Sequence, residues 1–290
     1  MQELGFIGLG IMGKPMAKNL LKAGYELVVY DINEQAIEEL VENGAKAGRS
    51  SKDVAERSEV IITMLPNSPE VREVVLGRNG IAEGAKPGTI VLDMSSISPI
   101  VSQEIAKELA KRQVIMLDAP VSGGEPKAID GTLAIMVGGP EDAFTEVQEI
   151  LLHMGSSAVL VGEIGSGNVT KLANQIIVAL NIAAMSEAMV LAVKAGTDPE
   201  KVFQAIRGGL AGSTVLDAKM PLVLERNFEP GFRIELHIKD LLNALDTAHA
   251  VGTPLPLASQ VLEFMQALKV DGKAKEDHGG LIQFYEKLAK

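Results

Sequence analysis

The segment Leu4-Gly5-Phe6-Ile7-Gly8-Leu9-Gly10-Ile11-Met12-Gly13 decides the fold, because a short apolar run passes directly into a glycine-rich turn. The apolar run predicts a buried strand, and residues 16–23 predict a helix after the turn. The spacing Gly8-x-Gly10-x-x-Gly13 is typical of a dinucleotide-binding loop. In such a loop Gly8 permits the tight turn, Gly10 lets a pyrophosphate approach the backbone, and Gly13 lets the helix pack closely on the strand.

The second predicted strand ends at an acidic residue that fits the same site. Residues 26–30 are mostly apolar, and Asp31 follows them at roughly the 20-residue spacing from the glycine loop that is expected for an acid bonding the ribose 2′-hydroxyl. A carboxylate here repels a 2′-phosphate, and Ile32 adds no positive charge. We therefore expect NAD as the preferred cofactor, with NADP possible. The alternative is that Asp31 only forms the turn before a helix capped by Asn33.

Strands and helices alternate through the first half of the chain. Apolar runs at residues 60–64, 89–93 and 114–118 predict further strands, and Ser68-Pro69 and Ser98-Pro99 are typical of helix N-termini. This alternation predicts an α/β, Rossmann-type domain with a mainly parallel sheet. Ligands bind beyond the carboxyl ends of such strands, where three loops lie: Leu65-Pro66-Asn67, Ser95-Ser96 and Ala119–Gly124.

The third of these loops contains Ser122-Gly123-Gly124. A serine followed by two glycines exposes backbone N–H groups and a hydroxyl without side-chain obstruction, which is typical of an anion-binding site. A turn that merely requires positive φ explains the glycines equally well, and the loop alone leaves both interpretations open.

The strand pattern ends at Gly162, and the remaining segments predict helices. We expect a NAD-binding Rossmann-type domain over residues 1–164 and an all-α domain over 165–290. The long helix predicted for residues 168–194 is apolar enough to suggest a membrane span. Asn181 and Ser186-Glu187 interrupt it, however, so we expect a buried helix of a soluble protein.

Lys171 lies one turn inside that helix, and Asn174 and Gln175 follow three and four positions later. Residues at these spacings share one helix face, so the ammonium and the two amides point into one region. A lysine on so apolar a helix either extends to water or serves a site.

Composition excludes several classes of function. The net charge of −11 argues against nucleic acid as a partner. The absence of cysteine excludes disulfides and thiolate chemistry, and the four histidines show no metal-binding spacing. No basic-then-apolar leader is seen at the beginning, so we expect a cytoplasmic protein without a metal or a membrane partner.

At family level the sequence resembles the β-hydroxyacid dehydrogenases. Motifs in the family's order carry this resemblance across almost the whole chain: Gly8–Gly13, Leu65-Pro66-Asn67, Ala119–Gly124, Gly131-Thr132-Leu133, Gly167–Asn174 and Lys239-Asp240. The resemblance implies that Lys171 is the catalytic lysine. It implies substrate contacts at Ser122, Gly123, Gly124, Asn174, Gln175 and Asp240. It also implies cofactor contacts at Ser96, Phe232 and Lys239, beside the loops already named.

One departure from the family concerns the amides. Many relatives carry Asn-Asn where this chain has Asn174-Gln175. Both positions share the face of Lys171, so the sequence leaves open which amide contacts substrate. Without the resemblance, Lys239 fits an exposed amphipathic face.

The resemblance implies reversible hydride transfer between NADH and the aldehyde carbon of a small 3-oxo acid, with Lys171 as general acid and base. Lysine is protonated at neutral pH, and partial burial is expected to lower its pKa towards the useful range. Glu125–Asp130 and Arg207–Ser213 resemble members that reduce tartronate semialdehyde to D-glycerate. Chemistry on 3-hydroxyisobutyrate, glyoxylate or succinic semialdehyde stays open.

Two other classes of function remain as alternatives. Imine reductases use a similar fold but generally lack this lysine, so Lys171 argues against them. A non-enzymatic nucleotide-binding protein does not need Lys171 together with Ser122-Gly123-Gly124. The resemblance also implies a homodimer or homotetramer, which the length of the apolar helix favours.

Overall fold

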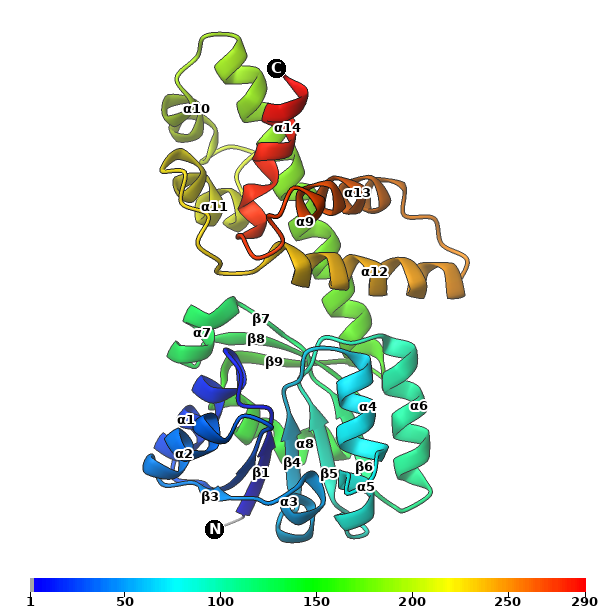
Figure 1. Cartoon of the computed structure of the whole chain (residues 1–290). Coiled ribbons are helices and arrows are strands. Elements are labelled where there is room, and N and C mark those ends of the chain that lie inside the picture. Colours follow the sequence, from blue (N-terminus) through cyan, green and yellow to red (C-terminus); the bar gives the residue numbers. More distant parts are fainter. Residues whose placement is uncertain (1–2) are drawn as a thin grey trace. The chain divides into compact units, whose positions relative to one another are not determined.

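The computed structural model describes residues 3–290, which divide into two compact units (Figure 1). The first unit ends at Lys171 and the second covers Leu172–Lys290. The division falls inside helix α9 (Ser166–Lys194), after Lys171. The first turn of α9 therefore belongs to the first unit.

The first unit is built on one sheet with the strand order β3-β2-β1-β4-β5-β6-β8-β7, and β9 pairs with β8. From β3 to β6 all neighbouring strands are parallel, which confirms the predicted Rossmann-type, mainly parallel sheet. β6 and β7 pair with β8 in antiparallel fashion. The strands are β1 (Glu3–Ile7), β2 (Glu26–Tyr30), β3 (Lys46–Ala47), β4 (Val60–Thr63), β5 (Ile90–Asp93), β6 (Ile115–Asp118), β7 (Val121–Ser122), β8 (Leu133–Gly138) and β9 (Gly155–Gly162).

Two hydrophobic clusters flank this sheet because successive strand residues point to opposite faces. In β1, Leu4 and Phe6 belong to one cluster, with Leu20 of α1, whereas Ile7 belongs to the other, with Ile105 of α6. The helices of this unit are α1 (Gly13–Lys22), α2 (Glu34–Glu42), α3 (Ser51–Arg57), α4 (Ser68–Leu76), α5 (Ile81–Gly84), α6 (Pro99–Ala110), α7 (Gly124–Asp130) and α8 (Glu141–Leu152).

The helix N-termini agree with the sequence in part. Asn33 caps α2, and its side chain accepts a hydrogen bond from the backbone N–H of Gln35, as predicted. Ser68-Pro69 marks the N-terminus of α4 as predicted, but Ser68 is the first helical residue and Asn67 occupies the cap position. The Ser68 hydroxyl instead accepts a hydrogen bond from the Ser98 backbone N–H. Ser98 precedes α6 but makes no side-chain cap bond.

The described elements of the second unit are all helices, which agrees with the predicted all-α domain. The unit comprises the rest of α9, α10 (Pro199–Ile206), α11 (Thr214–Leu224), α12 (Ile234–Ala250), α13 (Pro256–Val270), the 3₁₀ turn η1 (His278–Leu281) and α14 (Ile282–Leu288). A third hydrophobic cluster joins them, and α9 contributes Ile182, Met185 and Met189 to it.

By length and composition α9 meets the criteria for a membrane-spanning helix, and it is the one such helix among residues 3–290. A core helix of a soluble protein passes the same test. The side chains that α9 gives to the third hydrophobic cluster are consistent with a core helix.

The start of α9 is held to the sheet by a buried carboxylate. Asp118 accepts hydrogen bonds from the backbone N–H groups of Gly165, at 2.7 Å, and Asn168, at 2.6 Å. The Asn168 side chain accepts from the Ile97 backbone N–H and donates to the Ser102 hydroxyl. These bonds satisfy N–H groups that a helix N-terminus leaves without an intrahelical partner, and they fix where α9 begins.

A second buried carboxylate, Asp93, ends the neighbouring strand β5. Its Oδ1 accepts from the Thr63 hydroxyl and from the Ser95 backbone N–H, whereas its Oδ2 has no hydrogen-bond partner among the described residues. Burial raises the pKa of Asp93 to about 6, and it likewise raises the pKa of Asp118 to about 6. Both groups therefore keep their protons to a higher pH than in the unfolded chain.

We predict that Asp93→Asn becomes more stable relative to the wild type as pH rises from about 4 to about 6. The folded carboxyl has a pKa of about 6 and the unfolded one about 3.8, so the wild type loses stability through this window. The loss is on the order of 3 kcal/mol. Asparagine avoids it and can still accept from Thr63 and Ser95. Urea unfolding of both proteins across this pH range measures the difference.

Asp118→Asn provides the comparison, because an amide has one acceptor oxygen and cannot serve both N–H groups of α9. We expect this variant to be destabilised at every pH. A stability difference between Asp93→Asn and the wild type that does not change with pH contradicts the prediction.

Candidate active site

The predicted cofactor loops of the first unit all follow the carboxyl ends of parallel strands. The glycine loop follows β1, Asp31 and Ile32 follow β2, Leu65-Pro66-Asn67 comes after β4, and Ser96 comes after β5. Because β1, β2, β4 and β5 are mutually parallel, the structure brings these residues to one edge of the sheet.

The glycine loop has the close contacts that its pattern predicts. Gly8 has φ of +97°, and an added Cβ would lie 2.3 Å from the Met64 carbonyl oxygen. At Gly13 a Cβ would lie 1.9 Å from the Gly8 carbonyl oxygen. Both glycines are thus required by the fold. At Gly10 a Cβ would meet no atom within 4 Å, so the open backbone there leaves room for a ligand group.

Asp31 is tied to the glycine loop itself. One carboxylate oxygen accepts from the Leu9 backbone N–H at 2.5 Å, and the other accepts from the Asn33 backbone N–H at 2.8 Å. The residue thus forms part of the turn, as the alternative interpretation has it. Each carboxylate oxygen has further acceptor capacity, so the same geometry can also accept a ribose hydroxyl.

The loop after β4 presents an acceptor that the chain does not satisfy. Its course is fixed because the Leu65 backbone N–H donates to the Ser95 hydroxyl at 2.9 Å. The side-chain oxygen of Asn67 is buried and has no hydrogen-bond partner among residues 3–290. Such atoms are rare in folded proteins. The open backbone at Gly10 and this acceptor fit a bound dinucleotide.

The Ser122-Gly123-Gly124 segment forms the turn from β7 into α7. Gly123 and Gly124 have φ of +143° and +71°, so the backbone conformation accounts for both glycines. Ser122 is partly buried and Gly123 is exposed. The turn therefore reaches the surface at Gly123.

Lys171 lies on α9, one turn after Asn168 and its bonds to the sheet. Lys171 is only 6% exposed. A lysine is almost never this buried unless it is paired or functional. The anchoring bonds of Asp118 and Asn168 therefore also determine where this ammonium lies.

In the second unit the structure brings together Asn174, Gln175, Asp240 and Lys239. The Asn174 amide donates to the Gln175 side-chain oxygen at 2.9 Å. The Gln175 amide donates to Asp240 at 2.6 Å, and the other Asp240 oxygen lies 3.1 Å from the Lys239 ammonium. That oxygen makes no hydrogen bond of good geometry, so we treat the contact with Lys239 as an ion pair only.

Phe232 lies beside two histidines of the same unit. Its ring is 5.8 Å from that of His237 and 5.2 Å from that of His278. Asp277 holds the backbone before it, since its carboxylate accepts from the N–H groups of Gly231 and Phe232 and from the Lys219 ammonium. Phe232 is therefore firmly placed.

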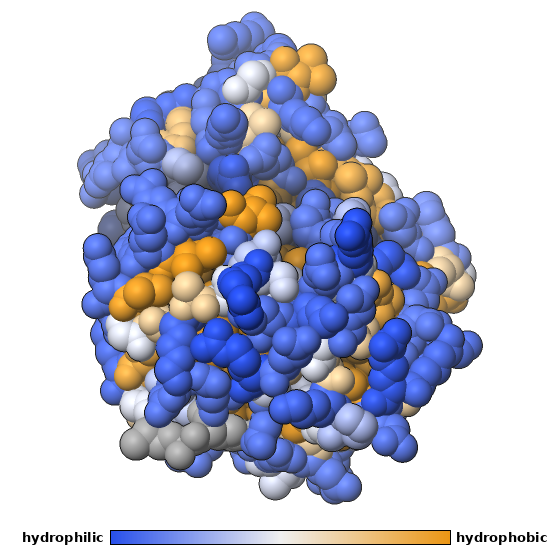
Figure 2. Space-filling view, turned by 60° about the horizontal axis from the view of Figure 1, so that its bottom comes forward, coloured by the Kyte–Doolittle hydropathy of each residue, from blue (hydrophilic) through white to orange (hydrophobic). Residues whose placement is uncertain are grey.

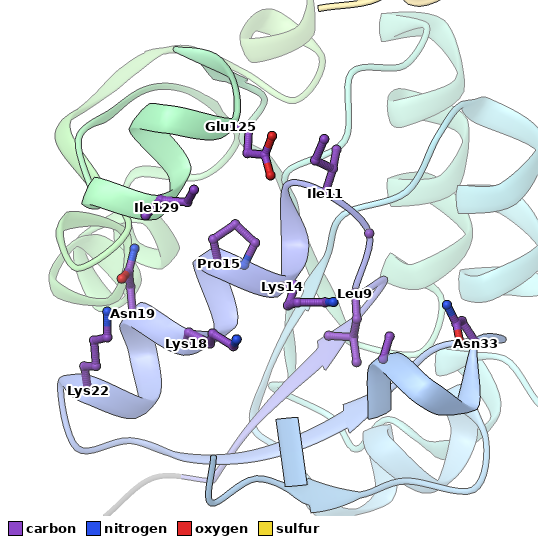
Figure 3. A pocket seen from close by; sticks show the side chains of 12 residues that line it. Leu9, Ile11, Lys14, Pro15, Lys18, Asn19, Lys22, Asn33, Glu125 and Ile129 are labelled. Atoms are coloured by element: carbon purple, nitrogen blue, oxygen red, sulfur yellow. The ribbon is translucent and has the colours of Figure 1, made fainter. Parts of the chain in front are cut away.

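A cavity of about 530 Å³ adjoins the glycine loop (Figure 3). Figure 3 shows Lys14 and Lys18 along α1, and Glu125 of α7 nearby. Both lysines form ion pairs with Glu39, whose pKa their hydrogen bonds lower to about 2. Of the predicted site residues, Leu9, Gly10 and Ile11 line the cavity.

Sequence reasoning missed the residues that hold the site in place. Asp118, Asn168, His237 and His278 were not singled out for any such role. Asn168 precedes Lys171 by three positions and so shares its helix face, which is a signal that the sequence does carry. Among residues 3–290 no group of His, Asp or Glu is arranged to hold a metal ion.

Known families match nearly the whole chain. A model described as the NAD-binding domain of 6-phosphogluconate dehydrogenase matches residues 3–162. A second, described as NAD-binding of NADP-dependent 3-hydroxyisobutyrate dehydrogenase, matches residues 165–285. The two matches cover the Rossmann-type sheet and the helical unit in turn.

Individual proteins agree with these models. The 2-hydroxy-3-oxopropionate reductase of Escherichia coli (strain K12) is 45% identical and covers 99% of this chain and 98% of its own. The mitochondrial 3-hydroxyisobutyrate dehydrogenase of Homo sapiens is 39% identical, and the match covers 97% of this chain and 86% of the human protein. The structure of Mycobacterium tuberculosis 3-hydroxyisobutyrate dehydrogenase with L-serine has a TM-score of 0.91 at 31% identity, covering 98% of each chain. The chain therefore belongs to the β-hydroxyacid dehydrogenase family of NAD(P)-dependent oxidoreductases.

Proposed function

We propose that this protein reduces tartronate semialdehyde (2-hydroxy-3-oxopropanoate) to D-glycerate with NADH, and that Lys171 is its general acid. The observation that carries the proposal is a buried lysine on α9, whose start is bonded to the carboxyl end of β6. The 45% identity to a 2-hydroxy-3-oxopropionate reductase supports this substrate over others of the family.

The substrate class rests on a wider set of relatives. A relative at 31% identity has been solved with L-serine, which is a small 3-hydroxy acid. Relatives at 39% identity are 3-hydroxyisobutyrate dehydrogenases, so 3-hydroxyisobutyrate is the second candidate within the same chemistry. A panel of semialdehyde acids that includes methylmalonate semialdehyde and glyoxylate separates these substrates.

In the proposed reaction the residues of the chain orient the substrate and move a proton. When bound, the nicotinamide supplies the hydride that reduces the aldehyde carbon. The aldehyde oxygen then gains negative charge, which the Lys171 ammonium stabilises and neutralises by donating a proton. The hydroxyl and backbone amides at Ser122-Gly123-Gly124 bind the substrate carboxylate, and Asn174 provides a further contact to the substrate.

The cofactor side follows from the loops of the first unit. The helix that begins at Gly13 directs its free N–H groups and positive dipole end to the pyrophosphate. Asn67 and Ser96 provide further contacts, and the family resemblance assigns cofactor contacts to Phe232 and Lys239 as well. Asp31 accepts from the ribose hydroxyl and repels a 2′-phosphate, so NADH is the preferred form.

The surface suits a soluble protein, and we propose a cytoplasmic location. Hydrophilic side chains cover most of the face seen in Figure 2, and apolar residues form separate strips between them. The net charge of −11 favours solubility.

We predict that Lys171→Ala lowers the rate of semialdehyde reduction by ~10²–10⁴-fold, the range typical of a lost general acid. NADH affinity changes little, because the glycine loop and Asp31 remain. Steady-state kinetics and NADH titration measure the two effects. Lys194→Ala, which removes an exposed lysine at the end of the same helix, serves as the control. Near-wild-type turnover in Lys171→Ala would refute the assignment.

We predict that Asp31→Ala narrows the preference for NADH over NADPH, because the variant no longer repels the 2′-phosphate. The ratio of kcat/KM for the two cofactors measures the change. Glu38→Ala removes an equal charge from an exposed position on α2 and should keep the wild-type ratio. If Asp31→Ala also keeps it, Asp31 belongs to the turn alone.

We further propose that the protein is a homodimer or homotetramer held partly by α9. Ile177 and Leu191 on this helix are 61% and 71% exposed, and large apolar side chains at such exposure mark interaction surfaces. We expect Ile177→Asp to lower the molar mass measured by light scattering, because a buried unpaired charge opposes association. Val270→Asp, at an exposed position on α13, is the control. An unchanged mass for Ile177→Asp removes α9 from the interface.

A further inference from the structure

Gln175 is bonded to its surroundings at its side chain and at its backbone, all within the second unit. Its side-chain N–H donates to Asp240 at 2.6 Å, and its side-chain oxygen accepts from Asn174 at 2.9 Å. Its backbone carbonyl oxygen lies 3.0 Å from Nε2 of His237. His237 and Asp240 are three positions apart on α12 and so share one face of it. One residue of α9 is thus held by two residues of α12.

The orientation of the Gln175 amide follows from its partners. An ionised carboxylate can only accept hydrogen bonds, so the nitrogen of Gln175 must face Asp240 and the oxygen must face Asn174. The nitrogen of Asn174 then donates to Gln175, which leaves the oxygen of Asn174 directed elsewhere. The Asp240 carboxylate therefore sets the orientation of both amides in turn.

The histidine contact is fixed by similar reasoning. A carbonyl oxygen only accepts, so Nε2 of His237 must carry the proton. Nδ1 of His237 lies 2.9 Å from Nδ1 of His278, so one of these two nitrogens donates and the other accepts. Both rings are buried, at 0% and 5% exposure. The backbone of Gln175 is accordingly held by the Nε2–H of a buried histidine.

Burial separates the two neighbouring amides of α9. Gln175 is 4% exposed, whereas Asn174 is partly exposed. Asp240 is 1% exposed. A substrate in solution can thus reach Asn174, while Gln175 and Asp240 lie behind it.

We propose that Gln175 and Asp240 are positioning residues that act through Asn174, the amide that contacts the substrate. This inference rests on the proposed function, because Asn174 is placed there as a substrate contact. Asp240 holds the nitrogen of the Gln175 amide, and the oxygen of that amide then holds the nitrogen of Asn174. The Gln175–Asp240 pair accordingly acts on turnover without touching substrate.

Exchanging the amide and the carboxylate tests this arrangement. Gln175→Glu places two carboxylates face to face, so it should break the contact and lower kcat/KM by about 10²-fold, the loss typical of a misplaced group. Asp240→Asn keeps an acceptor oxygen for Gln175 and should lose far less. The double variant Gln175→Glu with Asp240→Asn restores an amide facing a carboxylate, and we expect it to recover most of the activity.

The pH profile of Gln175→Glu provides a second readout. At low pH the two carboxyl groups share a proton and can bond again, so activity relative to the wild type should fall as pH rises. The charged and titratable groups around the pair are Asp240, Lys239, His237 and His278, with Lys171 one turn earlier on α9. If the introduced carboxylate instead met the substrate carboxylate directly, the double variant would remain as impaired as Gln175→Glu. That result overturns the proposal.

Gln175→Met and Ser186→Ala separate positioning from stability. Ser186 is buried on the same helix, where its hydroxyl donates to the Ile182 carbonyl, so its loss should lower the melting temperature without lowering kcat. Gln175→Met should lower kcat and leave KM for NADH unchanged. Equal kcat losses in both variants, or none in Gln175→Met, contradict a positioning role.

The contact can also be measured without turnover, which separates this inference from the proposed function. In thermal unfolding, the melting-temperature losses of Gln175→Glu and Asp240→Asn should not add in the double variant, because the exchange restores the bond. Additive losses refute the contact whatever the enzyme reduces. If these losses are non-additive but no semialdehyde acid is reduced by the wild type, the proposed substrate is at fault and not the Gln175–Asp240 pair.

Discussion

The structure depends on the pair of hydrogen bonds that Asp118 accepts from the backbone N–H groups of Gly165 and Asn168, at the start of α9. A buried carboxylate is expensive to desolvate, and only well-placed donors offset that cost. Here the donors are the N–H groups that a helix N-terminus leaves without partners. The carboxylate gains donors and the N–H groups gain an acceptor, so the end of β6 and the start of α9 are fixed together. The position of Lys171 follows from this bond, because a helix transmits the placement of its first turn to the next.

Other hydrogen bonds hold the remaining site residues in place. In the first unit, main-chain atoms make most of the bonds: the Leu9 N–H orients Asp31, and the Ser95 hydroxyl orients the Leu65 loop through its backbone. In the second unit, side chains bond to side chains through Asp240 and Gln175. Rigid placement costs entropy during folding rather than during each turnover, which suits a family whose chemistry is a single hydride and a single proton.

The sequence was most informative where the residues of one feature lie close together along the chain. The glycine loop, Asp31 and the alternation of strands and helices each occupy one short stretch, so the Rossmann-type sheet and its ligand-binding edge could be predicted. Lys171, Asn174 and Gln175 were linked for the same reason, since they share one helix face. The bonds of Asp118 to Asn168 and of His237 to His278 join residues 50 and 41 positions apart. No periodicity encodes such contacts, and only the fold reveals them. The bond from the Ser98 backbone N–H to the Ser68 hydroxyl, across 30 positions, belongs to the same class.

The placement of the unit boundary inside α9 bears on how this chain can be divided. A fragment that stopped at residue 164 would contain every strand but would strip Asp118 of both its donors, leaving a bare carboxylate in an apolar interior. Exchange of the helical half between relatives keeps a backbone N–H at each of these positions, but it changes the side chains around them, and the Asn168 side chain is the one that bonds to Ile97 and Ser102. Chimeras should instead be joined beyond Lys171, where α9 belongs to the second unit and no longer bonds to the sheet through Asp118.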